Sequence, residues 1–214
     1  MNQLLPQVQT IAVIGLGLIG GSLAKAAKQT GFAAQTIGYS LNLAEVKLGV
    51  ELGVVDFAAS TVKEAVEHAD IVVVAVPVKA FEASLAEIKP YLKPGAVLTD
   101  VGSVKGCFIA SVEKVFGVMP DFVVPGHPIA GSERSGVLAA DANLFRHHKV
   151  ILTPTAKTSA SALGLVHEMW KSCGASVLEM TVEHHDEVLA ATSHLPHLLA
   201  FSLVDTLAGE EENQ

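Results

Sequence analysis

The chain has 214 residues, half of them hydrophobic, and a formal net charge of −8 at pH 7. This length allows one large domain, or one domain and part of a second. The acidic balance, with Arg134 and Arg146 as the only arginines, argues against a nucleic-acid partner. We also expect no membrane partner, because we find no apolar run long enough to span a bilayer. With two cysteines and no signal peptide, we expect a cytoplasmic location.

The first elements expected along the chain are a strand and a helix joined by a glycine-rich turn. Four apolar residues, 11–14, lead into glycines spaced G-x-G-x-x-G, and an alanine-rich helix follows. This arrangement holds a dinucleotide pyrophosphate at the helix N-terminus. The motif alone is weak, but this context favours a dinucleotide site over an ordinary glycine-rich turn. We expect cofactor contacts from Gly15, Gly17, Leu18, Ile19 and Gly20.

Short β-branched runs then alternate with helical stretches up to about residue 124. This pattern predicts an α/β fold with a doubly wound, mostly parallel sheet and helices on both faces. The expected strands are 11–15, 35–39, 54–57, 71–76, 96–100 and 122–124, and the expected helices are 18–30, 43–52, 61–68, 78–92 and 104–116. Strand 71–76 ends at Pro77, and we include Val76 and Pro77 among the cofactor-binding residues.

The remainder of the chain is less regular at first and ends in a long apolar helix. Segment 125–143 precedes strand 150–153, helix 160–173 and strand 177–180. Helix 182–208 is expected to kink at Pro196 and is apolar around much of its circumference. Either it packs on a partner chain or the chain is cut short. We expect a Rossmann-type dinucleotide-binding domain at 1–181 and the first helix of an incomplete helical domain at 182–214.

The end of strand 35–39 bears on the choice of nucleotide. Ser40 stands where an NAD site normally has an acidic residue for the ribose 2′-OH. A serine does not repel a 2′-phosphate as a carboxylate does, but the sequence offers no neighbouring arginine to hold one. NAD and NADP therefore both stay open, and Ser40 is equally well explained as a turn residue.

Two side chains follow strands at the edge where open α/β sheets bind ligands. Ser103, in DVGSVKG, stands where a helix N-cap is expected, and a capping hydroxyl at this edge still faces the crevice. His127, in VPGHPIAGS, has the rigid Pro/Gly setting that fixes a general base. The alternative for His127 is a solvated loop histidine.

The long helix carries a cluster of histidines. Ser193 and His197 are four residues apart and share a helix face. Residues 184–186, His-His-Asp, invite a metal reading, but the spacing H-E-x-x-H is absent and no cysteine accompanies them. We therefore expect no metal, and a solvated face for His147, His148, His184 and His185.

Taken together, these stretches resemble the prephenate/arogenate dehydrogenase family of tyrosine biosynthesis. The matching motifs are GLGLIGGS, DVGSVKG, GHPIAGSERSG and ATSHLPHLLAFSL, which occur in the family's order and span nearly the whole chain. The resemblance implies an NAD(P)-dependent oxidoreductase that oxidatively decarboxylates prephenate to 4-hydroxyphenylpyruvate, arogenate to tyrosine, or both. Hydride passes to nicotinamide, the ring carboxylate leaves as CO2, and a phenol forms.

The resemblance also implies roles for five residues. His127 matches the histidine that accepts the proton of the ring hydroxyl, and Ser103 matches the serine that positions this hydroxyl. Ser132 stands where relatives commonly have threonine in the substrate site. Ser193 and His197 match the pair that reaches the substrate from the helical domain.

Relatives continue beyond residue 214 with an arginine-bearing segment that binds substrate carboxylate and with a dimer interface. The resemblance therefore implies a homodimer for the complete protein, and we expect this chain to bind nucleotide but turn over poorly. The candidate cations that it offers the substrate are Lys105 and Arg134, and Glu133 matches an acidic residue near the pocket mouth.

Two other functions stay open. A β-hydroxyacid dehydrogenase has a similar architecture, but it requires a catalytic lysine early in the long helix, and 183–197 contains none. A catalytically silent nucleotide-sensing module would keep the dinucleotide site but would leave Ser103, His127 and His197 unexplained.

Overall fold

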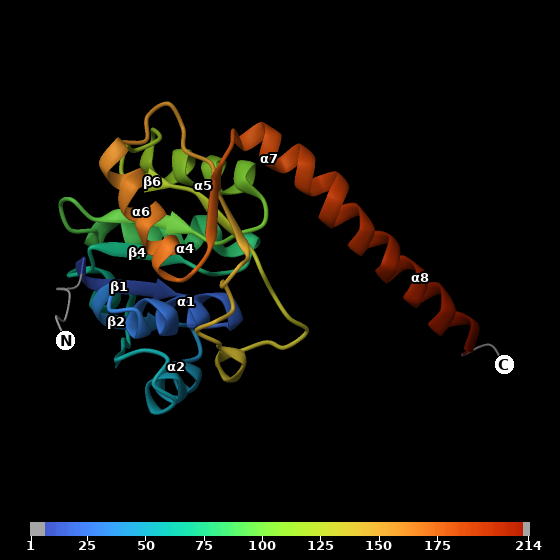
Figure 1. Ribbon diagram of the computed structural model, residues 1–214, viewed down its shortest axis with the longest axis horizontal. Coiled ribbons are helices and arrows are strands. Elements are labelled where there is room, and N and C mark those ends of the chain that lie inside the picture. Colours follow the sequence, from blue (N-terminus) through green and yellow to red (C-terminus); the bar gives the residue numbers. More distant parts are fainter. Residues whose placement is uncertain (1–6, 212–214) are drawn as a thin grey trace.

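The computed structural model describes residues 7–211, so the outer ends of the two expected domains, 1–6 and 212–214, lie outside the described residues. Its centre is a six-stranded parallel sheet in the order β3-β2-β1-β4-β5-β6 (Figure 1). This order reverses direction between β1 and β4, as in dinucleotide-binding folds, and the predicted doubly wound architecture is confirmed. The strands are β1 Val8–Ile14, β2 Ala33–Tyr39, β3 Phe57–Ala58, β4 Ile71–Val74, β5 Val97–Asp100 and β6 Val123–Val124.

Helices cover both faces of this sheet. Successive β1 side chains alternate between two hydrophobic cores: Ile11 and Val13 enter one, and Ala12 and Ile14 enter the other. The first core includes residues of α1 and α6, and the second includes residues of α3, α4 and α5. The helices are α1 Leu18–Gln29, α2 Leu43–Glu51, α3 Val62–Val66, α4 Phe81–Ile88, α5 Lys105–Phe116 and α6 Ala160–Ser172.

The irregular segment 125–143 contains a strand that the sequence did not indicate. Residues Gly126–Ile129 form β7, which pairs antiparallel with β8 (Lys149–Leu152), and β8 pairs parallel with β9 (Ser176–Glu179). Pro128 cannot donate to a ladder, but β7 is an edge strand of this small sheet, where proline is tolerated. His127 therefore lies on a strand and not in a loop.

The long C-terminal helix has a break in its hydrogen-bond pattern. It comprises α7 Val182–Leu189, a π-helical turn Ala190–His194 and α8 Leu195–Glu211. Pro196 lacks an N–H and its ring crowds the preceding turn, and the wider π turn immediately before it provides the space. The irregularity expected at Pro196 thus takes the form of a π turn.

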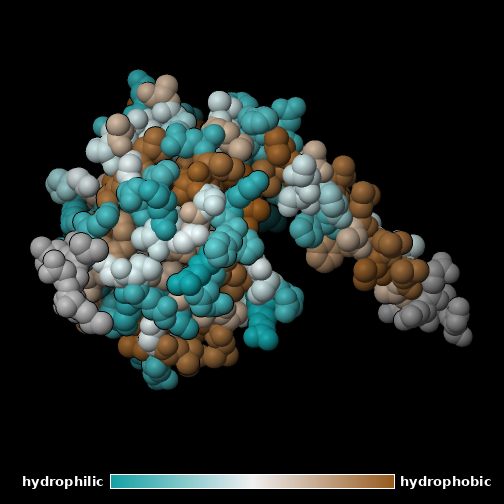
Figure 2. All heavy atoms as spheres, viewed as in Figure 1, coloured by the Kyte–Doolittle hydropathy of each residue, from teal (hydrophilic) through white to brown (hydrophobic). Residues whose placement is uncertain are grey.

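Beyond α7 this helix projects away from the rest of the chain (Figure 1). Apolar side chains lie exposed along the projecting part, as the brown spheres in Figure 2 show, and they belong to Leu195, Leu198, Leu199, Phe201, Leu203, Val204 and Leu207. Residues 182–208 form a helical run of 27 residues that is long and apolar enough to cross a membrane by length and composition alone. The expectation that no run is long enough was therefore wrong, because His, Ser and Thr interrupt the apolar residues of this helix but Asp, Glu, Lys and Arg are few in it.

Candidate active site

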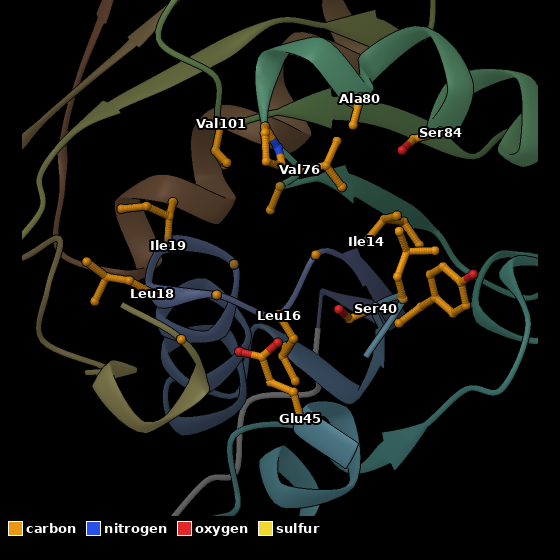
Figure 3. Close-up of a pocket in the computed structure, with 18 of the residues that line it drawn as sticks. Ile14, Leu16, Leu18, Ile19, Ser40, Glu45, Val76, Ala80, Ser84 and Val101 are labelled. Carbon is orange, nitrogen blue, oxygen red and sulfur yellow. The ribbon is translucent and has the colours of Figure 1, made fainter. Parts of the chain in front are cut away.

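A cavity of about 610 Å³ opens at the carboxyl ends of β1, β2 and β4 (Figure 3). Ligands bind at this edge of parallel sheets, where the strand order reverses. Its wall includes every residue for which a cofactor contact was predicted, namely Gly15, Gly17, Leu18, Ile19, Gly20, Ser40, Val76 and Pro77.

The glycine turn has the shape that a pyrophosphate requires. Gly15 has φ +100°, and a Cβ there would lie 2.4 Å from the carbonyl oxygen of Ala75. A Cβ on Gly20 would lie 2.2 Å from the carbonyl oxygen of Gly15. At Gly17 a Cβ would meet nothing within 4 Å, and no side chain caps the first turn of α1. The free N–H groups of that turn, beside open space at Gly17, fit a bound phosphate.

Arg134 lies on the wall of the same cavity as Ser40 and Glu45. The sequence offers no arginine near Ser40, but the fold brings Arg134 to the wall that Ser40 also lines. This placement arises because segment 131–140 folds back against α2, where the Val137 N–H donates to the Glu45 carboxylate at 3.1 Å. The cavity thus has a cationic side chain on the same wall as the residue that bears on nucleotide choice.

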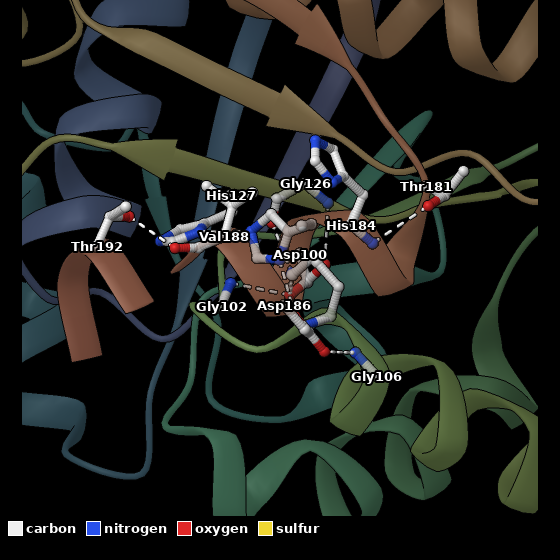
Figure 4. A network of polar contacts seen from close by, with 12 residues as sticks. Asp100, Gly102, Gly106, Gly126, His127, Thr181, His184, Asp186, Val188 and Thr192 are labelled. Carbon is white, nitrogen blue, oxygen red and sulfur yellow. Dashed lines mark hydrogen bonds and ion pairs between the residues drawn. The ribbon is translucent and has the colours of Figure 1, made fainter. Parts of the chain in front are cut away.

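A buried ion pair joins the end of β5 to the start of α5, and Figure 4 labels its acidic partner, Asp100. The Lys105 ammonium contacts the Asp100 carboxylate, and both side chains are fully buried. Burial raises the pKa of Asp100 and lowers that of Lys105, and the attraction between the two charges opposes both shifts. Lys105 also donates to the carbonyl oxygen of Gly126 at 2.7 Å. Lys105 is therefore a structural group, and the expectation that it offers a free cation to substrate was wrong.

The Asp100 carboxylate connects the cavity wall to the strand that carries His127. It accepts the Gly102 N–H at 2.8 Å and the Gly126 N–H at 3.1 Å. Gly102 lines the cavity, and Gly126 precedes His127 in the chain. One buried carboxylate thereby fixes the position of the histidine relative to the nucleotide cavity.

Ser103 does not cap the helix that follows it. Helix α5 begins at Lys105, its N-cap residue is Val104, and no side chain of its own caps it. The carboxylate of Asp186, which lies on α7, accepts the N–H groups of Lys105 and Gly106 at 2.8 Å each. A distant carboxylate thus performs the capping that was expected of Ser103, whose hydroxyl is half-buried and has no capping role.

His127 is half-buried, and its ring lies beside a second histidine. Its Nδ1 lies 2.9 Å from the Nε2 of His185, and the two ring centroids are 5.1 Å apart. Burial, followed by electrostatic interactions with Lys105, His185 and His194, lowers the pKa of His127 to about 3. The imidazole is therefore neutral near pH 7, as a general base must be.

His185 is fully buried, which contradicts the solvated face expected for it, whereas His147, His148 and His184 are exposed as expected. The sequence signal that could have identified His185 is helical spacing, because His185 and Leu189 are the two buried residues of α7 and lie four apart.

The other predicted substrate residues are more open. Ser132 is exposed, Ser193 is half-buried, and His197 is exposed with its Nδ1 2.9 Å from the carbonyl oxygen of Ser193. Glu133, at the predicted pocket mouth, is exposed too. No hydrogen bond joins His127 to Ser103, Ser132, Ser193 or His197, all of which lie within the described residues 7–211.

Comparisons of the sequence and of the fold with known proteins identify one family. The family model described as "Prephenate dehydrogenase, nucleotide-binding domain" matches residues 23–179, and "Prephenate dehydrogenase, dimerization domain" matches residues 181–214. The chain is similar to the cyclohexadienyl dehydrogenase of Zymomonas mobilis, with 38% identity over 94% of this chain and 68% of that protein. It is also similar to the prephenate dehydrogenase of Bacillus subtilis, with 37% identity over 95% of this chain and 54% of that protein.

Among solved structures, the chain is similar to prephenate dehydrogenase from A. aeolicus in complex with hydroxyphenyl propionate and NAD+. The TM-score is 0.86 and the identity is 38%, over 94% of this chain and 70% of that one. The chain therefore spans between 54% and 70% of the length of these relatives.

Proposed function

We propose, given that the chain belongs to the prephenate dehydrogenase family of NAD(P)-dependent oxidoreductases, that it oxidatively decarboxylates prephenate, arogenate or both. The ring carbon that bears the hydroxyl gives up hydride, the ring carboxylate leaves as CO2, and the ring becomes a phenol. The nicotinamide of a bound NAD or NADP supplies the hydride acceptor. The residues that would hold the dinucleotide are those of the glycine turn, with Ser40, Val76 and Pro77 along the same wall.

In this proposal the chain's own residues bind the substrate, align it with the nicotinamide and deprotonate its ring hydroxyl. Neutral His127 takes the proton of the ring hydroxyl as the C–H bond breaks, and Ser103 orients that hydroxyl. Ser132, Ser193 and His197 contact the substrate from the segment after β7 and from the long helix. Aromatisation supplies much of the driving force, so the protein mainly has to align the reacting groups.

The observation that carries the proposal is the position of His127. Its imidazole is neutral and lies on β7. The preceding residue, Gly126, donates its N–H to the Asp100 carboxylate, which also accepts the N–H of Gly102 on the cavity wall. A nucleotide-sensing module without chemistry has no need for a base fixed at this edge.

The exposed helix α8 supports a second part of the proposal. Its apolar side chains are exposed around the helix, and residues 181–214 match the dimerization model. We propose that they pack against a second copy in a cytoplasmic homodimer, and not in a membrane.

The experiment is an assay of prephenate and arogenate with NAD+ and with NADP+. It uses this chain beside a version that continues over the length of its relatives. The expected result is reduced nicotinamide formed together with CO2, and faster turnover by the longer version. If neither version reduced either nucleotide with either substrate, the proposed activity would be wrong.

A further inference from the structure

Behind His127 lies a continuous line of polar contacts that ends at a helix N-terminus (Figure 4). The His127 Nδ1 faces the His185 Nε2 at 2.9 Å, and the His185 Nδ1 faces the Asp186 Oδ1 at 2.7 Å. The carboxylate of Asp186 in turn accepts the N–H groups of Lys105 and Gly106. Histidine, histidine, aspartate and helix are therefore in contact in series.

The direction of these hydrogen bonds follows from their outer end. The Asp186 carboxylate accepts two backbone N–H groups at the positive end of α5, so it is held as an anion that can only accept. Burial alone would raise the pKa of Asp186, but the hydrogen bonds from Lys105, Gly106 and His185 outweigh this effect and lower it. The His185 Nδ1 must consequently carry the proton that lies between them.

The direction of the hydrogen bond between His185 and His127 follows from the charge of His185. Burial lowers the pKa of His185 despite the neighbouring Asp186 carboxylate, so the ring is neutral near pH 7. A neutral imidazole with a proton on Nδ1 has a lone pair on Nε2. That lone pair accepts from His127, which must carry its own proton on Nδ1.

We propose that His185 and Asp186 are positioning residues that hold His127 as the Nδ1–H tautomer, which leaves the Nε2 lone pair to accept the substrate proton. The proposal rests on the proposed function in that it assigns this proton acceptance to Nε2. The charged and titratable groups that act on the two histidines are Asp100, Lys105, Asp186 and His194. Of these, Asp186 alone is hydrogen-bonded to either ring.

Substitution of Asp186 by Asn tests the direction of these hydrogen bonds with little change in the shape of the side chain. The Asp186→Asn side chain has one acceptor oxygen for the three donors that the carboxylate serves, namely the N–H groups of Lys105 and Gly106 and the Nδ1–H of His185, so its NH2 group must face at least one of them. The proton on the His185 Nδ1 is then held less firmly, and with it the proton on the His127 Nδ1. We expect kcat to fall about 10- to 100-fold, by analogy with the loss of the hydrogen-bond partner behind a metal-bound histidine. The nucleotide Kd is expected to stay within about twofold, since no residue of the cavity wall is altered.

His185 offers a conservative variant that restores the pattern. A glutamine in His185→Gln has one acceptor for His127 and one donor for Asp186, as the neutral histidine has. We expect His185→Gln to keep most of kcat and His185→Leu to lose it. His184→Gln is the matched control, because His184 lies next in the chain, is exposed, and its side chain makes no hydrogen bond to the described residues.

The deciding measurement is the ring-nitrogen spectrum of this chain labelled with 15N-histidine, with the His127 signals assigned by their loss in His127→Gln. We expect a protonated Nδ1 and an unprotonated Nε2 in the wild type, and a changed pattern in Asp186→Asn. A protonated Nε2 in the wild type would overturn the proposal, as would unchanged kcat in Asp186→Asn. The spectrum requires no turnover, so a chain that is inactive on every substrate would contradict the proposed function and leave the tautomer test standing.

Discussion

The carboxylate of Asp100 and the ammonium of Lys105 are in contact where neither side chain is exposed to solvent. Around them, Asp100 binds the N–H groups of Gly102 and Gly126, and Lys105 binds the carbonyl oxygen of Gly126. This pair therefore joins the ends of β5 and β7, where the cavity wall and His127 lie.

Replacing Lys105 with Met is expected to lower the free energy of unfolding by about 3–5 kcal/mol, because it leaves Asp100 buried without a partner. Urea unfolding at pH 7 measures the loss. The double variant Asp100→Leu with Lys105→Met is the control, because it buries no charge and should recover part of the loss. A single variant as stable as the wild type would contradict this role.

The glycine turn yields a matched pair of variants. Gly20→Ala places a Cβ against the Gly15 carbonyl oxygen, so we expect it to destabilise the fold. Gly17→Ala meets no protein atom, so we expect normal thermal unfolding but nucleotide binding weakened at least tenfold, since the methyl group occupies phosphate space. Calorimetry and a nucleotide titration separate the two effects. Equal nucleotide affinity in Gly17→Ala and the wild type would show that no phosphate of the nucleotide binds beside Gly17.

Acid is expected to destabilise the protein through His127 before the carboxylates contribute. The folded state lowers the pKa of His127 from 6.5 to about 3, so between these values the unfolded chain binds more protons. Stability is therefore complete above pH 6.5 and falls as pH decreases, at up to about 1.4 kcal/mol per pH unit for this residue.

Urea unfolding between pH 7 and 5 tests this dependence by comparing the wild type with His127→Gln. The variant should show a shallower pH dependence, with the residual slope due to His185, whose pKa is lowered too. The lowered pKa of Asp56, Asp70 and Asp186 affects stability only below about pH 4. Identical slopes in the two proteins would show that His127 titrates normally.

Nucleotide choice depends on the wall that Ser40 shares with Arg134. Ser40→Asp adds a carboxylate that repels a 2′-phosphate and binds a ribose hydroxyl, so we expect the Kd ratio of NADP to NAD to rise at least tenfold. Arg134→Ala is expected to raise the same ratio, whereas Arg146→Ala, in a different cavity, serves as the control. Unchanged Kd ratios in both Ser40→Asp and Arg134→Ala would show that the 2′ group of the nucleotide ribose does not bind at this wall.

Much of the sheet could be predicted because its signals are local. Runs such as 71–76 are apolar on both faces, and the glycine turn lies between a buried strand and an alanine-rich helix. Strand β7 was missed because Gly126-His-Pro-Ile has a single strand former, Ile129, and no apolar alternation, and its pairing with β8 decides its conformation.

The parts of the candidate site that escaped prediction depend on contacts between distant residues. Ser103 has the sequence of a helix cap, but Asp186, 81 residues from Lys105, fills that place. His185 appears as one more polar residue on a polar helix until α7 packs against α5 and buries it. Arg134 joins the cavity only because its segment folds back onto α2. Apart from the four-residue spacing of His185 and Leu189 on α7, the sequence carries no local signal for these contacts.

His127 is the proposed base of a dehydrogenase, and His127→Asn tests this role most directly. Steady-state kcat with prephenate or arogenate and the Kd of the nucleotide are measured on the wild type and the variant. We predict a kcat lower by about 10²- to 10⁴-fold, with an unchanged nucleotide Kd. A variant that kept wild-type kcat would contradict the account, because the proton of the ring hydroxyl would then have another acceptor.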